Sequence, residues 1–477
     1  MARKSWFRIA WNSSVAWALL ATLLLLGINS YWLSSNSDIA APPLPHGDGP
    51  DYESLAYSLS VGNRYEFAWE DPKWQEPYRK SDLAFQYTQL DRRDWPGPTT
   101  ARPPALPWLI SQIYRWVPRG PQAFACVRWM SVGALSIAGG LAVWLAGNLA
   151  RKHVNLVRGN SQIIWNLHAI ASAVALAMAA IDRTIKTYVN DFLTEPWALL
   201  AVTCFAISLL AWSDSPWKLR WIIPAGWFFG SMVLFRSLYI FWLPVIVTGI
   251  VLVSRRSSRS NAMDFGVRRW WIAPVLFGLV VSLIVGPWWM RNCSVTGRLM
   301  PMGAQGAASL RGGYSDEALQ DWGNWHAEAE ISMHSKLDAT EGSEDWTAAQ
   351  REVALSDLAA RETWTWVQDH WLDLPRLGAM RWITHWGPWR IDHVAWKCAA
   401  ILGLFWVWRS GWHAGVVLAS ILVADGLTTI GLYETGGRFL IPLHGVLYGL
   451  SGVGIAGCLA LMWGNLVHPM HEQTQSQ

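Results

Sequence analysis

The sequence predicts an all-α protein that crosses a membrane about ten times and carries two long segments outside it. Three observations support this fold class. Of the 477 residues, 52% are hydrophobic and only 15% are charged, which is too apolar for a soluble domain of ordinary composition. Uncharged apolar runs long enough to cross a bilayer recur along the chain. Many of the 36 Trp residues stand at the ends of these runs, as is typical of side chains at membrane interfaces.

The first apolar run, Val15 to Leu33, carries no charge and is long enough to span the bilayer core. Arg3, Lys4 and Arg8 precede it, so the positive-inside rule places the N-terminus in the cytoplasm. No small-residue cleavage pattern follows, and we therefore expect a retained anchor rather than a signal peptide. The residues after this anchor are expected on the outer face.

Further apolar runs follow the anchor and bring the total to about ten spans. The short connections at Arg151-Lys152, Lys218 to Arg220, Arg255 to Arg269 and Arg409 are basic, and all of them fall on the cytoplasmic side of this count. The two runs that flank Arg236 have only roughly 15 to 18 residues each, so they are expected to cross tilted or incompletely. The runs are Met130 to Leu149, Ile163 to Ile181, Pro196 to Trp212, Trp221 to Phe235, Ser237 to Ser254, Trp270 to Met290, Val394 to Trp408, Gly411 to Leu432 and Phe439 to Val467.

Two long segments on the outer face divide the chain. Residues 1–34 are the cytoplasmic tail and anchor, 35–123 the first outer loop, 124–290 a set of transmembrane helices, 291–393 the second outer loop, and 394–477 the last transmembrane helices with a cytoplasmic tail. Within the second loop, Val353, Leu358, Trp364 and Val367 follow a helical spacing between Ala348 and Trp371. This spacing predicts a small helical cap that lies on the membrane.

Several function classes lack their usual sequence signs. The chain has no G-x-x-x-x-G-K-[ST] motif and no inner loop long enough for a nucleotide-binding domain. The H-E-x-x-H and G-x-S-x-G motifs of zinc proteases and serine hydrolases are also missing. The five cysteines form no zinc spacing or disulfide framework, and the net charge of +4 reflects the basic inner loops rather than a nucleic-acid partner. Acidic chemistry at the outer membrane surface remains.

An ordered set of motifs points to such chemistry. Asp48 stands four residues before Tyr52 and eight before Ala56, directly after the anchor. This pattern resembles the first outer loop of the GT-C superfamily of integral-membrane glycosyltransferases, and it is similar to bacterial relatives of the dolichyl-phosphate-mannose protein mannosyltransferases and of the aminoarabinose lipid A transferases. Similar motifs follow in order at Thr100 to Pro107, Leu193 to Pro196, Pro287 to Asn292 with Gly297, and Glu434 to Pro442.

The resemblance implies an inverting transfer of a sugar from a polyprenyl-phosphate-linked donor to an acceptor, at the outer face of a bacterial cytoplasmic (inner) membrane. The acceptor must lose a proton, and a carboxylate in an apolar, partly dehydrated site suits this task. We expect Asp48 to be this base, with Asp51 as the alternative and Tyr52 as a substrate-binding neighbour. An Asp between glycines and proline also suits a simple turn. The sugar and the acceptor, whether lipid, glycan or protein, are not readable.

The departing phosphate requires a fixed cation, and arginine binds oxyanions through two parallel hydrogen bonds. We rank the candidates Arg438, Arg291 and Arg102 in that order, followed by Arg236, whose own span is one of the short ones. The alternative for each is an arginine that extends to lipid headgroups.

Other acidic and histidine side chains allow more than one interpretation. Glu195 opens a span and is expected either to orient the acceptor or to favour the helix dipole. Asp425 lies within an apolar run, where an ionisable side chain is either functional or a polar contact between helices. His385, His393 and His444 are too scattered for a metal site, and Asp48 with Asp51 alone would make a poor one. We therefore expect no obligate metal or other cofactor, with a divalent cation as the alternative.

A transporter or flippase of a lipid-linked substrate is the rival interpretation, because transporters also combine apolar spans with a few buried charges. That class predicts paired half-sequences with broken helices near the membrane midplane, and the sequence has no such internal symmetry. A long carboxylate-rich outer loop is also less needed for transport. An inactive scaffold of the same fold has the same sequence features.

Overall fold

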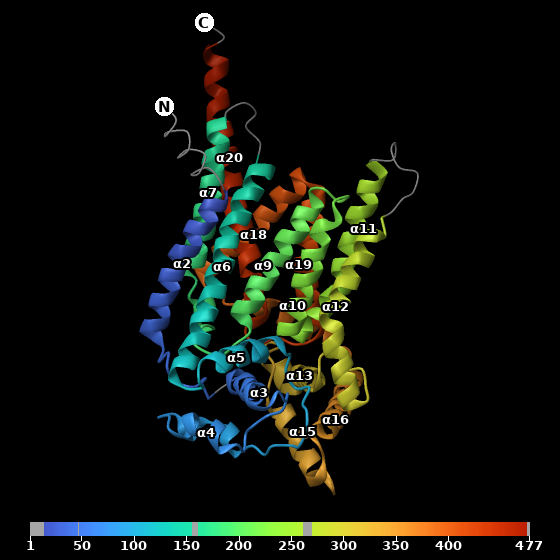
Figure 1. Cartoon of the computed structure of the whole chain (residues 1–477). Helices are drawn as coiled ribbons and strands as arrows, with labels where there is room; N and C mark the ends of the chain where they lie inside the picture. Colours follow the sequence, from blue (N-terminus) through green and yellow to red (C-terminus); the bar gives the residue numbers. More distant parts are fainter. Residues whose placement is uncertain (1–13, 46, 155–160, 261–269, 475–477) are drawn as a thin grey trace.

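The computed structural model describes residues 14–45, 47–154, 161–260 and 270–474, and these residues form helices joined by loops, without a β-strand. Arg3, Lys4, Arg8 and His46, together with most of the basic connection before Trp270, lie outside the described residues. Apolar helices form an upright bundle, and the two long segments between them gather at one end of it as a cap (Figure 1).

The bundle identifies the chain as a multi-pass membrane protein. Eight of its described helices are long and apolar enough to cross a membrane, and Asn166–Ile181 and Leu219–Phe235 are shorter apolar helices beside them. Together they correspond to the predicted spans, so the all-α polytopic fold class is confirmed. The bundle helices are α2 (Ser14–Asn36), α6 (Pro121–His153), α7 (Ser161–Ile181), α9 (Glu195–Ser213), α10 (Ile222–Phe235), α11 (Leu243–Ser260), α12 (Ile272–Thr296), α18 (Ile391–Ser410), α19 (Trp412–Gly431) and α20 (His444–Thr474).

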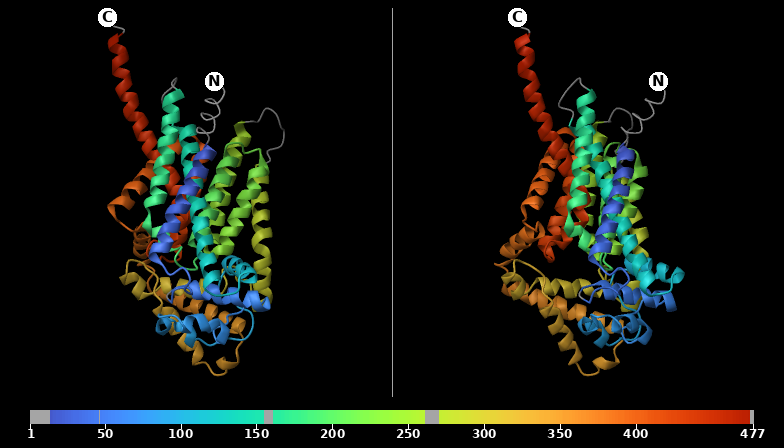
Figure 2. Two further views of the ribbon diagram at one scale, coloured as in Figure 1. Left: turned by 60° about the vertical axis from the view of Figure 1, so that its left-hand side comes forward. Right: turned by 90° about the vertical axis from the view of Figure 1, so that its left-hand side faces the viewer.

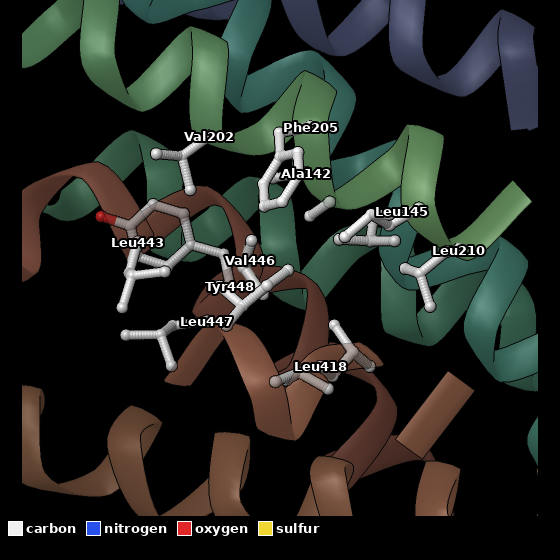
Figure 3. Close-up of a cluster of buried hydrophobic side chains, with 14 of the residues drawn as sticks. Ala142, Leu145, Val202, Phe205, Leu210, Leu418, Leu443, Val446, Leu447 and Tyr448 are labelled. Atoms are coloured by element: carbon white, nitrogen blue, oxygen red, sulfur yellow. The ribbon is translucent and has the colours of Figure 1, made fainter. Parts of the chain in front are cut away.

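The centre of the bundle is packed from α6, α9, α19 and α20. Leu145, Phe205, Leu418 and Val446 lie together there (Figure 3), and each is exposed by 1% or less. Elsewhere glycines let helices touch: a Cβ on Gly403 of α18 would lie only 1.9 Å from the carbonyl oxygen of Leu450 in α20. Because lipid offers little hydrophobic drive between helices, such close backbone contact is what holds membrane bundles together.

The first cap segment joins α2 to α6. Its helix α3 begins directly after Asp48, and Pro50 in its first turn has the backbone angle that a helix start needs. The next helix is capped by Asp71, whose side chain accepts a hydrogen bond from the Lys73 amide at 2.8 Å. The elements are α3 (Gly49–Gly62), α4 (Pro72–Arg79), η1 (Ala84–Gln86), η2 (Thr88–Asp91) and α5 (Ala105–Trp116).

The second cap segment joins α12 to α18 through a small helical domain. Its longest helix, α16, starts at a capping box in which Thr347 and Gln350 exchange hydrogen bonds. The predicted helix between Ala348 and Trp371 therefore exists, because α16 ends at Asp369. The elements are α13 (Ala304–Gly313), α14 (Asp316–Gln320), α15 (Glu328–Asp338), η5 (Ser343–Asp345), α16 (Ala348–Asp369) and α17 (Leu374–His385).

The face of α16 that packs inside the protein is not the one marked by the predicted apolar spacing. Trp364 is 63% exposed, whereas Leu355, Ala359 and Trp366 are buried. The helix packs through Leu355 and Ala359 against α13 and α15, where Ala308 and Met333 complete the apolar cluster. Contact of the cap with the membrane stays a prediction.

Both cap segments lie at the same end of the bundle (Figures 1 and 2). The cap end also carries three short elements that interrupt the chain near the bundle: α8 (Arg183–Thr187), η4 (Ser237–Trp242) and η6 (Arg438–Leu443). The opposite end includes the basic last turn of α6 and the connection η3 (Leu219–Trp221) with its Arg220.

Candidate active site

Asp48 stands at the start of α3, but its carboxylate does not cap that helix. The adjoining Gly49 lies against Asp191, and a Cβ at Gly49 would come within 2.6 Å of that carboxylate. Asp191 in turn accepts hydrogen bonds from the amides of Leu44 at 3.1 Å and Phe192 at 2.7 Å, and burial raises its pKa to about 6. The glycine before Pro50 is thus needed for close contact, and the Asp48 side chain remains available for other partners.

Glu53 anchors the other side of α3. Its fully buried carboxylate accepts hydrogen bonds from Trp74 at 2.6 Å and from Tyr78 and Tyr114 at 2.8 Å each, and it forms an ion pair with Arg119 at 2.6 Å. These donors belong to α4, to α5 and to the loop before α6, so one carboxylate ties the first cap segment together. Sequence reasoning missed Glu53, although its place five residues after Asp48 in the same motif was a signal.

A cavity of about 130 Å³ lies where the two cap segments meet the bundle. Charged side chains line one part of it, and uncharged polar and apolar side chains of the second cap segment line another. Its walls come from the start of α3, the start of α9, the break between α10 and α11, α13 and the turn before η6. The lining residues whose side chains carry a charge or a hydrogen-bonding group are Asp48, Tyr52, Arg102, Thr194, Arg236, Ser237, Gln305, Ser309, Trp325, Tyr433, Thr435 and Arg438.

Asp48 bridges two arginines at this cavity. One carboxylate oxygen lies 2.9 Å from Arg102, and the other lies 3.0 Å from Arg438. Burial by itself would raise the pKa of Asp48, but the positive charges of Arg102, Arg438 and Arg236 hold that pKa well below its usual range. The side chain is therefore an anion that faces both guanidinium groups.

Glu195 is the second carboxylate of this network. It is fully buried as the first residue of α9 and forms ion pairs with Arg438 and, at 3.2 Å, with Arg236. Arg236 lies between α10 and η4 and has an extended backbone. The two short apolar runs that flank it therefore end at the cavity. The guanidinium group of Arg236 also lies 4.8 Å from the Phe439 ring centroid.

Arg102 is held between Asp48 and Asp51, with its Nε 3.0 Å and one terminal nitrogen 2.5 Å from the Asp51 carboxylate. The same guanidinium group lies 5.6 Å from the Tyr52 ring centroid. The backbone before Arg102 is fixed from the second cap segment, because Glu352 of α16 accepts hydrogen bonds from the Thr100 amide at 2.8 Å and the Thr100 hydroxyl at 2.7 Å.

Arg291 does not line the cavity but helps to fix the backbone before Arg102. It donates a hydrogen bond to the carbonyl oxygen of Thr99 at 2.6 Å and lies against the rings of Tyr65 and Trp288. Of the residues that the sequence singled out, the structure brings Asp48, Tyr52, Arg102, Arg236 and Arg438 to the cavity. Asp51 and Glu195 lie behind them as partners of lining arginines. Their roles in chemistry remain predictions.

Asp425 also lies away from the cavity lining, next to His385. Conversely, Gln305, Ser309, Trp325 and Tyr433 line the cavity without having been predicted. They come from the second cap segment and the turn after α19, and no spacing in the sequence relates these stretches to Asp48.

The charged side chains do not form a metal-binding cluster. Within the described ranges, no group of three or more His, Cys, Asp or Glu side chains is placed to hold a metal ion. Asp48, Asp51 and Glu195 each face a guanidinium group, so their oxygens already have cationic partners.

Comparisons with known proteins bear on the fold. No family model matches the chain, and no curated protein matches it in sequence. Among solved structures, the archaeal oligosaccharyltransferase AglB from Archaeoglobus fulgidus, in complex with an inhibitory peptide and a dolichol-phosphate, matches at 14% identity with a TM-score of 0.52, over 97% of this chain and 52% of that chain. Its apo form matches over 99% and 52% at the same identity and TM-score.

A further match is ArnT from Cupriavidus metallidurans bound to undecaprenyl phosphate, at 12% identity and a TM-score of 0.37, over 93% of this chain and 78% of that chain. The present chain spans about half the length of AglB. At such low identity the likeness to AglB concerns the fold. The chain therefore shares the fold of this archaeal oligosaccharyltransferase, and in its fold the resemblance that the motifs predicted is confirmed.

Proposed function

We propose that this protein is a membrane glycosyltransferase that moves a sugar from a polyprenyl-phosphate-linked donor to an acceptor at the outer face of the cytoplasmic membrane. The observation that carries the proposal is the cavity at the end of the bundle, where Asp48 meets Arg102, Arg236 and Arg438. A cluster of guanidinium groups beside a carboxylate suits a reaction in which a phosphate departs while a proton is removed. The fold shared with AglB, which has been solved with a dolichol-phosphate, supports the same kind of donor.

Arg236 is the best placed of the three arginines to bind the donor phosphate. It lines the cavity with its side chain only 10% exposed, and its one carboxylate partner, Glu195, lies at 3.2 Å. No other hydrogen-bond acceptor among the described residues is within reach of its guanidinium group. A fixed cation of this kind is most useful when the phosphate gains negative charge as the glycosidic bond breaks.

Binding of the phosphate would also activate Asp48. Arg102 and Arg438 keep the pKa of Asp48 low while they pair with it, and a phosphate that draws these guanidinium groups weakens both ion pairs. The carboxylate then becomes a stronger base next to the acceptor. In the transfer step Asp48 takes the acceptor proton, the acceptor atom bonds to the anomeric carbon, and the polyprenyl phosphate leaves with the electrons of the broken carbon–oxygen bond.

No obligate metal ion is part of this proposal. A divalent cation at Asp48, Asp51 or Glu195 would have to displace a guanidinium group that already neutralises the carboxylate. A metal chelator is accordingly expected to leave transfer unchanged.

The proposed location follows from charge. The basic connections at Arg151, Lys152 and Arg220 lie at the end of the bundle opposite the cap, and positive loops remain in the cytoplasm. The cavity is then extracytoplasmic and opens at the level where a polyprenyl phosphate headgroup resides.

In the decisive experiment, a polyprenyl-phosphate-linked sugar fraction is added to purified protein in detergent. The release of polyprenyl phosphate and the formation of a glycosylated product are then measured. Asp48→Asn keeps the side-chain shape and removes the base, so turnover is expected to fall by ~10² or more. Asp82→Asn changes an exposed acid of the same cap segment and is expected to leave turnover unchanged.

Measurements on the same protein in proteoliposomes distinguish a glycosyltransferase from a flippase. Movement of the lipid-linked sugar between leaflets without any glycosylated product, at equal rates for the native protein and Asp48→Asn, would show a flippase and overturn the proposal.

A further inference from the structure

A buried histidine lies between two carboxylates just behind the cavity. His385 ends α17, and its Nε2 is 2.6 Å from the Asp425 carboxylate of α19. Its Nδ1 is 2.8 Å from the carboxylate of Glu434, which follows α19. The three side chains are exposed by 5% or less. Water therefore does not compete with these contacts.

The geometry requires a charged imidazole. A carboxylate only accepts hydrogen bonds, so each ring nitrogen of His385 must carry a hydrogen to bond the oxygen that it faces. Burial by itself lowers the pKa of His385, but the carboxylates of Asp425 and Glu434 raise it to about 10. The imidazolium thus remains protonated through the neutral pH range.

Glu434 uses its second oxygen to fold the chain toward the cavity. That oxygen accepts hydrogen bonds from the amides of Thr435 at 2.7 Å and Gly437 at 3.0 Å. Gly436 and Gly437 have positive φ angles of 62° and 84°, which glycine adopts without strain. The turn that results ends at Arg438, and Thr435 and Arg438 both line the cavity.

The second cap segment holds this turn from the other side. The Trp325 amide donates to the carbonyl oxygen of Glu434 at 2.7 Å, and the Asn324 side chain accepts from the Gly436 amide at 3.0 Å. A chain of direct contacts therefore runs from His385 through Glu434 to the turn.

We propose that His385 is a positioning residue whose imidazolium holds the Glu434 carboxylate and, through it, the turn that presents Arg438 to the donor phosphate. The part that concerns phosphate rests on the proposed function, whereas the part that concerns the turn does not.

The surroundings of His385 explain why its charge matters. Besides the two carboxylates, α19 contributes the Thr429 hydroxyl at 3.3 Å from Nδ1. The rings of Trp382 on α17 and of Trp386, which follows that helix, lie beside the imidazole. Arg381 on the same helix donates to the carbonyl oxygens of Ile430 and Gly313 instead of to a carboxylate. Arg236 is a further charge that acts on Asp425. Without the imidazolium, Asp425 and Glu434 would be two buried anions with no cation between them, and the pair would take up a proton.

The first test measures hydrogen exchange of the backbone amides of residues 434–437 in the native protein, in His385→Gln and in His168→Gln. His168 is a matched control because it is also a buried histidine, but it contacts the carbonyl oxygen of Gly147 between α6 and α7. Faster exchange of the Thr435 and Gly437 amides is expected in His385→Gln only. Equal protection in all three proteins would overturn the proposal, whatever the enzyme binds.

If His385→Gln does not fold, Glu434→Ala provides a second test. Alanine has no side-chain oxygen that could accept from the imidazolium or from the turn amides. Faster exchange of the Thr435 and Gly437 amides is expected, and unchanged exchange would overturn the proposal.

The second test follows the affinity for undecaprenyl phosphate from pH 7 to pH 9. The native affinity is expected to be constant, because His385 keeps its proton over this range. In His385→Gln the affinity is expected to fall by up to about tenfold per pH unit, the slope that linkage to one proton allows. Adding Asp425→Asn to that variant removes the uncompensated charge and is expected to restore a flat profile.

A loss of affinity that does not depend on pH, or that Asp425→Asn fails to correct, would assign His385 a packing role only. If the native protein binds no undecaprenyl phosphate at all, the proposed function fails, and the exchange experiment still decides the role of His385.

Discussion

The three arginines at the cavity differ in how many carboxylates they pair with. Arg102 is shared between Asp48 and Asp51, and Arg438 between Asp48 and Glu195. Arg236 pairs with Glu195 alone. An arginine that has few internal partners has more hydrogen bonds to offer a ligand. At the scale of single residues, this count of partners is the reason that we propose Arg236 as the first contact of the donor phosphate.

Replacement of Arg236 by Ala is expected to lower turnover with a polyprenyl-phosphate-linked donor by ~10²–10³, because the departing phosphate loses a fixed cation in the transition state. Arg236→Lys keeps the charge but loses the planar pair of donors, and only partial recovery is expected. Steady-state kinetics of purified variants check this, with Arg64→Ala, an exposed arginine of the first cap segment, as the control. Native turnover in Arg236→Ala would transfer the phosphate-binding role to Arg102 or Arg438.

A comparison of variants also tests which of Asp48 and Asp51 is the base. Asp51 does not line the cavity and contacts Arg102 and Arg92, so it is expected to act through Arg102. Asp51→Asn should lower turnover by about tenfold, clearly less than the ~10² or more expected for Asp48→Asn. The two variants are to be measured under identical conditions. The reverse order of effects would make Asp51 the base.

Single residues also mark what the sequence could not predict. The motifs singled out Asp48, Tyr52, Arg102 and Arg438, and the structure brings all four to one cavity together with Arg236, which the sequence ranked last. The order of the arginines as phosphate ligands could not be predicted from the sequence, because it depends on which backbone and carboxylate groups each arginine contacts. Arg291, ranked second, donates to the Thr99 carbonyl, a contact between segments that are far apart in the chain.

At the scale of elements, α3 is held by one buried side chain. Glu53→Gln would remove the charge that pairs with Arg119 and replace an oxygen that accepts from Trp74, Tyr78 or Tyr114 by a donor. Breaking one partner of a buried ion pair typically costs about 3–5 kcal/mol, so a lower melting temperature and the loss of transfer are expected. Thermal unfolding of the purified protein in detergent measures the effect.

Glu76→Gln is the control for that element. Glu76 is exposed on α4 and pairs with Lys80 one turn away, where water screens the interaction. Its replacement is expected to leave the melting temperature unchanged. Equal melting temperatures for Glu53→Gln and the native protein would show that α3 is held by its apolar contacts instead.

Helix positions were more predictable than helix faces. Periodicity located α16 and marked Trp364 as part of its apolar face, but it did not mark Leu355 and Trp366, which are buried against the other cap helices. An apolar side chain on a cap helix can face either another cap helix or lipid, and both surroundings are apolar. Composition alone therefore cannot decide which side of such a helix becomes the inner one.

At the scale of the whole molecule, the bundle was predictable because hydropathy is a local property of each run. The described structure accordingly contains an apolar helix for each predicted span. The cavity was less predictable, because its walls come from separate segments between Asp48 and Phe439. Gln305, Ser309 and Trp325 reach it through the packing of the second cap segment, which no local pattern encodes.

The sidedness of the molecule remains a prediction with a direct test. Cysteines that replace the exposed residues Asp82 and Glu341 of the cap should react with a membrane-impermeant thiol reagent in intact cells, whereas one at exposed Lys218 should react only after the membrane is opened. Ser257 and Ser343 are less suitable sites, because both are buried and would resist labelling on either side.

The exposed native cysteines, Cys293 and Cys398, must first be replaced by serine so that only the introduced thiol reports. The expected pattern follows from the basic end of the bundle facing the cytoplasm, which leaves the cavity open to the outer surface. If Lys218→Cys were labelled in intact cells and Asp82→Cys were not, the protein would have the opposite orientation in the membrane. The donor phosphate would then have to be met on the cytoplasmic side, and the proposed reaction at the outer face would fall with it.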